Sequence, residues 1–127
     1  MAESRAYKRL KKLHSTAHWQ RFESWSGIGV FDANACKNGT EIWVEMKEVH
    51  PPKKLTGEWI VKPKVLKSQV AWEAQKRVIG GGKTFVAIMV GDDVLVVPGH
   101  YIKLLFRGVK LRELWDNRVP PERIFDA

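Results

Sequence analysis

The sequence predicts an α/β fold with a mixed central β-sheet flanked by helices, in the order α-β-β-β-α-β. Three observations predict this class. Asn38-Gly39 stands between two alternating segments, and this dipeptide is the strongest short-range signal of a β-hairpin. A helical segment over 69–79 leads through a run of glycines into an apolar strand over 84–90, and a basic helix over 3–14 opens the chain. We expect these elements to form one domain that covers residues 1–127.

One helix and three strands make up the first half of the predicted domain. The basic helix over 3–14 is followed by a short strand near 20–23. The hairpin strands then cover about 28–36 and 40–48, because a type I′ turn needs positive φ at both central residues and Asn38-Gly39 suits that requirement. We expect one helix to cover the apolar face of this hairpin.

A proline-containing segment separates the hairpin from the next helix. Pro51, Pro52 and Pro63 cannot continue a sheet, so residues 49–65 are predicted to form a long loop. A loop of this length in a compact domain is usually functional or mobile.

The remaining elements are a longer helix, two strands and two short helices. The helix over 69–79 precedes strands over 84–90 and 94–97, which should extend the sheet. Short helical patterns follow at 101–106 and 111–115. The expected core consists of apolar side chains from all of these elements: Leu10, Leu13, Phe31, Ile42, Val44, Met46, Val70, Ala74, Val78, Phe85, Ala87, Met89 and Leu95.

The predicted hairpin register decides which side chains share a face. A two-residue turn at Asn38-Gly39 pairs Asp32 with Glu45, and side chains alternate between the two faces of a strand. One face is then wholly apolar, with Phe31, Ala33, Ala35, Ile42, Val44 and Met46. The other face carries Asp32, Asn34, Glu41, Trp43, Glu45 and Lys47.

Asp32 and Glu45 form a carboxylate pair on this second face, with a Cβ separation of about 5 Å. Like charges so placed are destabilising unless one carboxyl is protonated, Lys47 offsets them, or a divalent metal bridges them. Of these three, a bridging metal would predict that the pair takes part in a chemical reaction. The alternative is an ordinary amphipathic hairpin with a solvated charged face, and a slip of the register would separate the pair.

Asp32 followed by Glu45-Met46-Lys47 resembles the core of the PD-(D/E)xK nuclease superfamily. Phe31 stands at the position of the proline after which the family is named. This is a common departure and does not change the catalytic chemistry. The resemblance implies a restriction-endonuclease-like core.

The segments around this motif resemble two branches of the superfamily. Gln69-Val70-Ala71-Trp72, the glycine turn and the following strand are similar to the helix, turn and strand of the VRR-type and Holliday-junction-resolvase-like branches. The helix bearing Glu3 and the serine-containing segment 21–27 resemble the resolvases' approach to the aspartate strand. The resemblance spans roughly residues 3–97.

The resemblance implies a magnesium-dependent endodeoxyribonuclease, which hydrolyses phosphodiester bonds and is structure-selective for branched DNA. Mg²⁺ prefers oxygen ligands and keeps several waters. Asp32, Glu45 and the backbone carbonyl of Met46 would therefore make a sufficient site for Mg²⁺ or Mn²⁺.

Three further residues receive roles from the same resemblance. Lys47 would orient or activate the attacking water and balance charge in the transition state. Gln69 occupies the position from which the next helix supports the site, and Glu3 would add a water-mediated metal contact. The predicted catalytic residues are Asp32, Glu45, Lys47, Gln69 and Glu3.

The charge of the chain predicts a polyanionic partner. The formal net charge is +8, so a long-range field would attract nucleic acid and the affinity should fall steeply with salt. Contacts to phosphates position a substrate without reading its sequence. The predicted DNA-binding residues are Lys8, Arg9, Lys11, Lys12, Arg21, Ser26, Lys53, Lys54, Lys62, Lys64 and Lys67.

The chain contains 6 tryptophans, which is heavy usage for its length. Trp43 shares the predicted polar face, while Trp19, Trp25 and Trp59 stand in or beside polar or basic segments. An indole can stack on an unpaired base, so one or two of these rings are expected to face nucleic acid. The others are expected in the core or at a subunit interface.

Assembly and location follow from the resemblance and from absences in the sequence. Resolvases of this superfamily are homodimers, so a homodimer is expected here, with the hydrophobic C-terminal part as its interface. The chain shows no signal peptide and no apolar run near 18 residues, and Cys36 has no partner for an internal disulfide. These features predict a cytoplasmic protein, and its small single-domain form favours a bacterial or phage-infected cell.

Two other functions stay open from the sequence. The first is a nucleic-acid-binding protein without catalysis, in which Asp32 and Glu45 are an incidental pair on the surface. The second is a nuclease that acts on DNA ends or nicks. Metal-dependent cleavage separates the first from an endonuclease, and substrate geometry separates the second.

Overall fold

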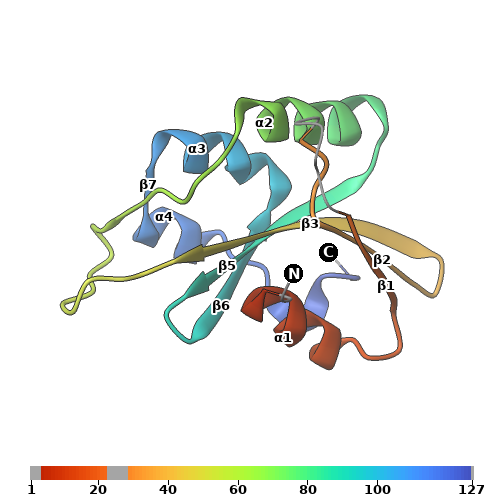
Figure 1. Cartoon of the computed structure of the whole chain (residues 1–127), viewed down its shortest axis with the longest axis horizontal. Coiled ribbons are helices and arrows are strands. Elements are labelled where there is room, and N and C mark those ends of the chain that lie inside the picture. Colours follow the sequence, from red (N-terminus) through yellow and green to blue (C-terminus); the bar gives the residue numbers. More distant parts are fainter. Residues whose placement is uncertain (1–3, 23–28, 127) are drawn as a thin grey trace.

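A five-stranded mixed sheet with the strand order β1-β2-β3-β5-β6 forms the centre of the molecule (Figure 1). The structure is a computed structural model that describes residues 4–22 and 29–126. β3 and β5 are parallel, and the other neighbouring pairs are antiparallel. The strands of this sheet are β1 (His18–Arg21), β2 (Ala33–Lys37), β3 (Thr40–Val49), β5 (Lys83–Val90) and β6 (Asp93–Pro98). The predicted mixed α/β fold is confirmed.

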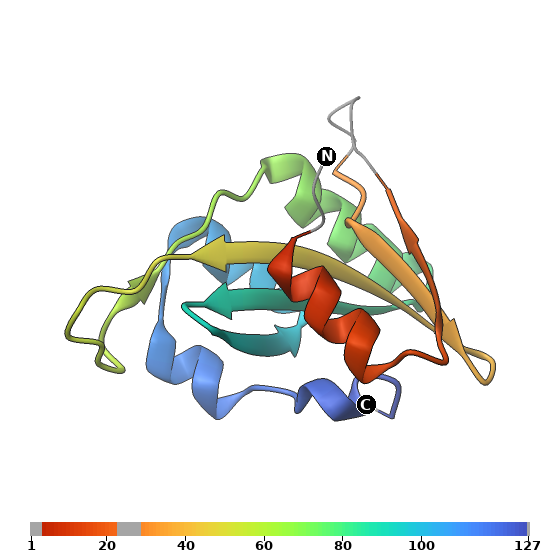
Figure 2. The same cartoon turned by 60° about the horizontal axis from the view of Figure 1, so that its bottom comes forward.

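Helices cover both faces of the sheet, with α1 on one face and α2 and α3 on the other (Figures 1 and 2). Four α-helices lie in the described ranges: α1 (Arg5–Leu13), α2 (Lys67–Ala74), α3 (Ile102–Arg107) and α4 (Leu111–Asp116). Short turns of other helix types cover Gln75–Ile79, Gly99–Tyr101 and Pro121–Arg123. No helix within the described ranges is long and apolar enough to cross a membrane.

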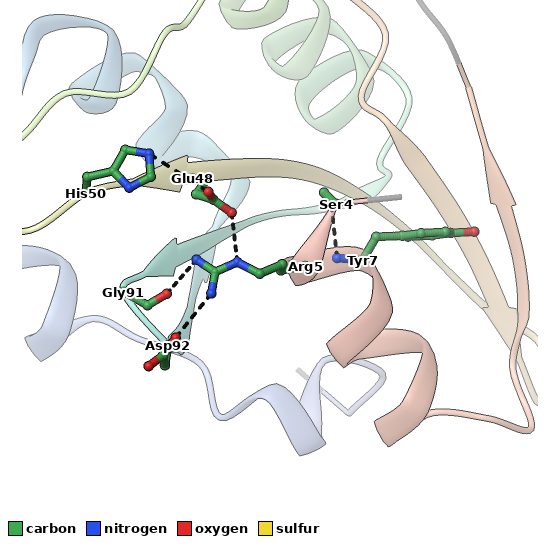
Figure 3. A network of polar contacts seen from close by, with 7 residues as sticks. All are labelled: Ser4, Arg5, Tyr7, Glu48, His50, Gly91 and Asp92. Atoms are coloured by element: carbon green, nitrogen blue, oxygen red, sulfur yellow. Dashed lines mark hydrogen bonds and ion pairs between the residues drawn. The ribbon is translucent and has the colours of Figure 1, made fainter. Parts of the chain in front are cut away.

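Local capping and an ion-pair network fix the start of α1. The Ser4 side chain accepts a hydrogen bond from the Tyr7 N–H at 3.1 Å, as an N-cap serine does. The Arg5 guanidinium then bonds Glu48 of β3 and Asp92 in the β5–β6 turn, both at 3.2 Å, and the Gly91 carbonyl (Figure 3). Arg5 thus ties the helix to β3 and to the β5–β6 turn.

The Asn38-Gly39 turn sets the hairpin register as predicted. Both residues have positive φ, 49° and 81°, as a type I′ turn requires. The pairs run from Lys37 opposite Thr40 to Ala33 opposite Val44. The predicted pairing therefore holds over the whole of β2.

The hairpin differs from its prediction at Asp32 and Phe31. β2 begins at Ala33 and not near residue 28, so Asp32 and Glu45 are not ladder partners. The side chain of Phe31 is fully buried on the α2 face against Trp72, so its placement with Ala33 on the apolar hairpin face is wrong. The alternation ends because the chain bends at Asp32.

The segment predicted as a long loop is partly ordered as sheet. β3 extends to Val49, and β4 (Ile60–Val61) pairs antiparallel with β7 (Val109–Lys110) in a separate two-stranded sheet. The predicted loop over 49–65 is therefore wrong at these positions. The prolines keep this segment out of the central sheet. β4 forms outside that sheet, because β7, which follows α3, pairs with it.

The predicted helix over 69–79 starts two residues earlier, at Lys67, and its last turn is a π turn. Val78 was expected in the core but is 69% exposed, because the wider π turn rotates it away from the sheet. Leu13 is also exposed, since α1 ends there and His14 is the buried residue at that end.

Candidate active site

Four predicted site residues from three segments meet on the α2 face of the sheet. Asp32 lies in the bend that precedes β2. Glu45 and Lys47 are two residues apart on β3, so their side chains point to the same face. Gln69 lies in the first turn of α2, which packs over that face. The structure therefore brings together Asp32, Glu45, Lys47 and Gln69 from distant parts of the chain.

Each of the two carboxylates is held by the backbone of the opposite segment. The Asp32 N–H donates to Glu45 Oε1 at 3.1 Å, and the Met46 N–H donates to Asp32 Oδ2 at 3.0 Å. Two backbone N–H groups therefore bond side chains here, where a continued ladder would bond them to carbonyls. This exchange is the physical reason why the hairpin pairing stops at Ala33.

Glu45 is a strongly perturbed acid. Its side chain is only 2% exposed. Burial, together with the nearby Asp32 carboxylate, raises the pKa of Glu45 to about 8, although the Lys47 ammonium acts in the opposite direction. A perturbed carboxyl beside a second carboxylate is typical of a functional site.

Lys47 is held in a defined position by three acceptors. Its Nζ lies 2.6 Å from the Lys64 carbonyl, 3.1 Å from Gln69 Oε1 and 3.1 Å from Glu45 Oε2. An ammonium group has three N–H donors, so all of them are matched. Lys47 is therefore a fixed charge beside the carboxylate pair.

Gln69 connects this lysine to the carboxylate. Its Nε2 donates to Glu45 Oε2 at 2.7 Å, while its Oε1 accepts from Lys47 Nζ and from the Leu66 N–H. The bond to Leu66 also closes the first turn of α2, so the end of the helix and the site share one side chain. Gln69 thus contacts both Glu45 and Lys47, and its supporting role in catalysis stays a prediction.

The donor set suits a hard divalent cation. Asp32 and Glu45 offer carboxylate oxygens that lie together, and the cost of ionising both of them would be offset by a bound cation. Met46 adds backbone to the same place, since its N–H already bonds Asp32. No cluster of three or more His, Cys, Asp or Glu side chains that could hold a metal occurs in the part of the chain that the structure describes. Any ion here would need backbone or water oxygens as well.

Hjc from Archaeoglobus fulgidus, a Holliday junction resolvase from an archaeal hyperthermophile, has a similar structure. The TM-score is 0.54 at 13% sequence identity, and the similarity covers 88% of this chain and 98% of Hjc. The chain has a restriction-endonuclease-like fold. No protein-family model matches the sequence, and no curated protein matches it either. Membership of the VRR-type branch stays a prediction.

The predicted DNA-binding residues lie on different sides of this fold. Lys8, Arg9, Lys11 and Lys12 belong to α1, across the sheet from the side chain of Glu45. Arg21 lies in β1 with its guanidinium over the Tyr7 ring. Lys53 and Lys54 are exposed between β3 and β4. Lys62 and Lys64 precede α2 and Lys67 is its first residue, and the backbone carbonyl of Lys64 contacts Lys47 of the site. Glu3 and Ser26 lie outside the described residues, as does Trp25.

Trp43 lies beside the site, as its place on the predicted polar face required. Its ring centroid is 5.3 Å from that of Trp72 of α2 and 5.3 Å from that of Phe22, and Lys76 Nζ lies 4.6 Å above it. The indole N–H donates to Glu41. Trp43 therefore packs α2 against β3, and its contact with a nucleic acid base stays a prediction.

One residue that the sequence analysis missed is Gly29. Its φ is +83°, and a Cβ at this position would overlap the Ser68 carbonyl group and lie 2.5 Å from the Gln69 nitrogen. The backbone that leads to Asp32 thus touches the first turn of α2. A glycine three residues before a candidate metal ligand could have suggested such a close approach.

A buried acid one turn after Gln69 anchors the rest of α2. Glu73 is 2% exposed, accepts from Arg77 Nε at 2.7 Å and accepts from the Thr84 hydroxyl of β5 at 2.7 Å. The carboxylate also raises the pKa of Arg77 through the hydrogen bond between them. Glu73 therefore fixes the helix on the sheet.

Arg77→Ala should destabilise the fold more than Glu73→Gln, by about 3 against about 1 kcal/mol. Loss of Arg77 leaves a buried carboxylate with only the Thr84 hydroxyl, whereas loss of the charge at Glu73 leaves a guanidinium that is 40% exposed and can be hydrated. Urea unfolding of both variants at pH 7 measures the difference. The opposite order would show that the carboxylate and not its partner stabilises α2.

Proposed function

We propose that this protein is a metal-dependent DNA endonuclease of the Holliday-junction-resolvase-like branch of the PD-(D/E)xK superfamily. One observation carries the proposal. The carboxylates of Asp32, which is half-buried, and Glu45, which is buried, are held together by reciprocal backbone bonds next to the fixed ammonium of Lys47. The fold likeness to Hjc and the net charge of +8 support the choice of DNA, and branched DNA in particular.

Asp32, Glu45 and the Met46 carbonyl would hold Mg²⁺ or Mn²⁺. A bound ion of this kind polarises a phosphate and lowers the pKa of a bound water. The chain itself provides the position and the charge. Lys47, whose Nζ lies 3.1 Å from Glu45 Oε2, would exchange one of its three acceptors for the attacking water and would stabilise negative charge that develops on the scissile phosphate.

Gln69 has a positioning role in this proposal. It bonds Glu45 with its amide nitrogen and Lys47 with its amide oxygen, so both groups keep their orientation before substrate arrives. We also propose that two copies act as a homodimer in the cytoplasm, as the resemblance to resolvases implies. Glu3 remains a proposed contributor of a water-mediated contact.

Cleavage of a labelled four-way DNA junction tests the proposal. We expect cleavage with Mg²⁺ or Mn²⁺, none with EDTA, and slower cleavage of a linear duplex of the same sequence. Lys47→Ala should reduce the rate by about a hundredfold or more, because it removes a fixed charge from the reacting centre. Lys83→Ala is the matched control, since it removes an exposed lysine from the opposite face of the sheet.

Each other outcome selects a different function. Cleavage that starts at DNA ends or nicks would show that the protein is a nuclease for those substrates and not for junctions. Binding without metal-dependent cleavage of any substrate would refute the endonuclease and leave a non-catalytic nucleic-acid-binding protein.

A further inference from the structure

A groove lies beside the candidate site, between the segment that leads into α2 and the C-terminal end of α3. Its lining residues are Lys62, Pro63, Lys64, Val65, Phe106 and Arg107. We call it the Lys62–Arg107 groove. Three of its six lining residues are cations and none is an acid.

No acid of the described residues neutralises the cations of this groove. No ion pair found within the described ranges includes Lys62, Lys64 or Arg107. Glu58, an acid of the adjoining β3–β4 connection, is occupied by Lys110 and Arg112, both at 2.9 Å. The positive charge of the groove is therefore available to an anionic ligand.

The two-stranded sheet keeps the walls of the groove in place. Lys62 follows β4 and Gly108 precedes β7, so the pairing of these strands brings the two residues together. Gly108 has a φ of +94°, and a Cβ there would lie 3.0 Å from Ile60 and 3.6 Å from the Lys62 side chain. Lys62 Nζ donates to the Phe106 carbonyl at 2.8 Å. The groove is thus a built feature of the fold.

A direct hydrogen bond connects the groove to the site. The Lys64 carbonyl, in the wall of the groove, accepts from Lys47 Nζ at 2.6 Å. Two residues later, the Leu66 N–H donates to Gln69 Oε1 at 3.1 Å. Anything that binds in the groove therefore lies next to the groups that surround Glu45.

We propose that the Lys62–Arg107 groove binds the sugar–phosphate backbone of the DNA strand next to the scissile phosphate. The inference rests on the proposed function and adds where the strand runs. A row of unpaired cations without acids suits consecutive phosphates, which position a substrate and carry no sequence information. Arg107, which the sequence analysis did not select, becomes a phosphate contact, and the basic face of α1 is not needed for this strand.

Salt-dependent binding tests the groove without cleavage. The affinity of the protein for a four-way junction and for a linear duplex is measured in EDTA between 50 and 300 mM NaCl. We compare wild type with Lys64→Ala/Arg107→Ala, which keeps the Lys64 carbonyl and so preserves the contact to Lys47. The control is Lys83→Ala/Arg123→Ala, which removes one exposed lysine and one exposed arginine elsewhere. Circular dichroism melts confirm that every variant is folded.

The groove variant should flatten the slope of log K against log salt by about 2 and weaken binding by about tenfold per residue at 0.1 M salt. The control lowers the net charge by the same amount but should leave the slope unchanged, because its residues lie outside the groove. Equal effects of the two pairs would overturn the proposal. So would an unchanged slope in the groove variant, or a loss of slope that appears only with Lys8→Ala/Lys12→Ala on α1.

Failure of the groove and failure of the nuclease give different results. If binding depends on the groove but the protein cleaves no substrate with Mg²⁺, the proposed endonuclease is refuted and the proposed DNA-binding groove is supported. If the protein cleaves DNA with metal but its affinity for DNA does not depend on Lys64 and Arg107, only the proposed role of the groove is refuted.

Discussion

Asp32→Asn is expected to abolish cleavage and, at the same time, to stabilise the protein at alkaline pH. Cleavage should fall by about a thousandfold, since a metal ligand contributes several kcal/mol to transition-state stabilisation. The folded protein should gain stability because the variant removes the half-buried carboxylate that repels the buried carboxylate of Glu45. The asparagine oxygen can still accept from the Met46 N–H, and its side-chain amide can donate to Glu45, with which the Asp32 carboxyl shares a hydrogen bond.

The pH dependence of stability gives this prediction its sign. Burial and the Asp32 charge raise the pKa of Glu45 from 4.5 to about 8 in the folded protein. Between these values the folded state binds more protons than the unfolded state, so the free energy of unfolding of wild type should fall as the pH rises. Without the Asp32 charge the folded pKa of Glu45 is lower, and the fall should be smaller.

Thermal melts in EDTA at pH 5, 7 and 8.5 measure this difference. At pH 8.5 we expect the Tm of Asp32→Asn to exceed that of wild type by about 4 °C, which corresponds to about 1 kcal/mol for a domain of this size. Asp116→Asn, an exposed carboxylate in α4, serves as the control and should change neither Tm nor cleavage. An Asp32→Asn protein that melts lower than wild type at every pH would contradict the proposed repulsion.

Gly29→Ala is expected to lower the free energy of unfolding by about 2–4 kcal/mol. An alanine at this position would have to adopt the left-handed backbone conformation of Gly29, and its Cβ would also overlap the Ser68 carbonyl group. Since backbone cannot move aside as a side chain can, α2 must shift relative to the bend at Asp32. Gln69 lies at that point, so cleavage by the folded fraction should fall as well.

Gly81→Ala separates conformational strain from overlap. Gly81 has a φ of +65°, close to that of Gly29, but apart from its chain neighbours no atom of the described residues lies within 4 Å of the position of an added Cβ. This variant should cost only about 1 kcal/mol and leave cleavage unchanged. Urea unfolding and junction cleavage of both variants measure the contrast. Equal losses of stability in the two variants would mean that the contact between Gly29 and Ser68 has no energetic role.

The Lys64 carbonyl explains why the groove and the site should respond together. Lys47 is matched by three acceptors, of which one belongs to the wall of the groove. A bound strand that moves the segment around Lys64 would also move Lys47. The two proposals can nevertheless be tested apart, because binding in EDTA needs no reaction at Glu45.

The features that depend on local conformation could be predicted from the amino-acid sequence. Asn38-Gly39 needs positive φ at both residues, so the turn type and the pairing from Lys37 to Ala33 followed from these two residues. The alternation of side chains on one strand then placed Glu45 and Lys47 on one face. The order of helices and strands followed from the periods of the apolar residues in the same way.

The points where these local elements end, and the segments that cover them, depend on contacts between distant parts of the chain. The bend at Asp32 depends on carboxylates that bond N–H groups of another segment, and the sequence pattern continues the strand past it. The short β4 forms because β7, a strand far along the chain, pairs with it. Ile60 is opposite Lys110, and Val61 is opposite Val109. The burial of Glu45, the bond from Lys47 to Lys64 and the contact of Gly29 with α2 also join distant segments. Their energies depend on packing between segments, which no local period or propensity encodes.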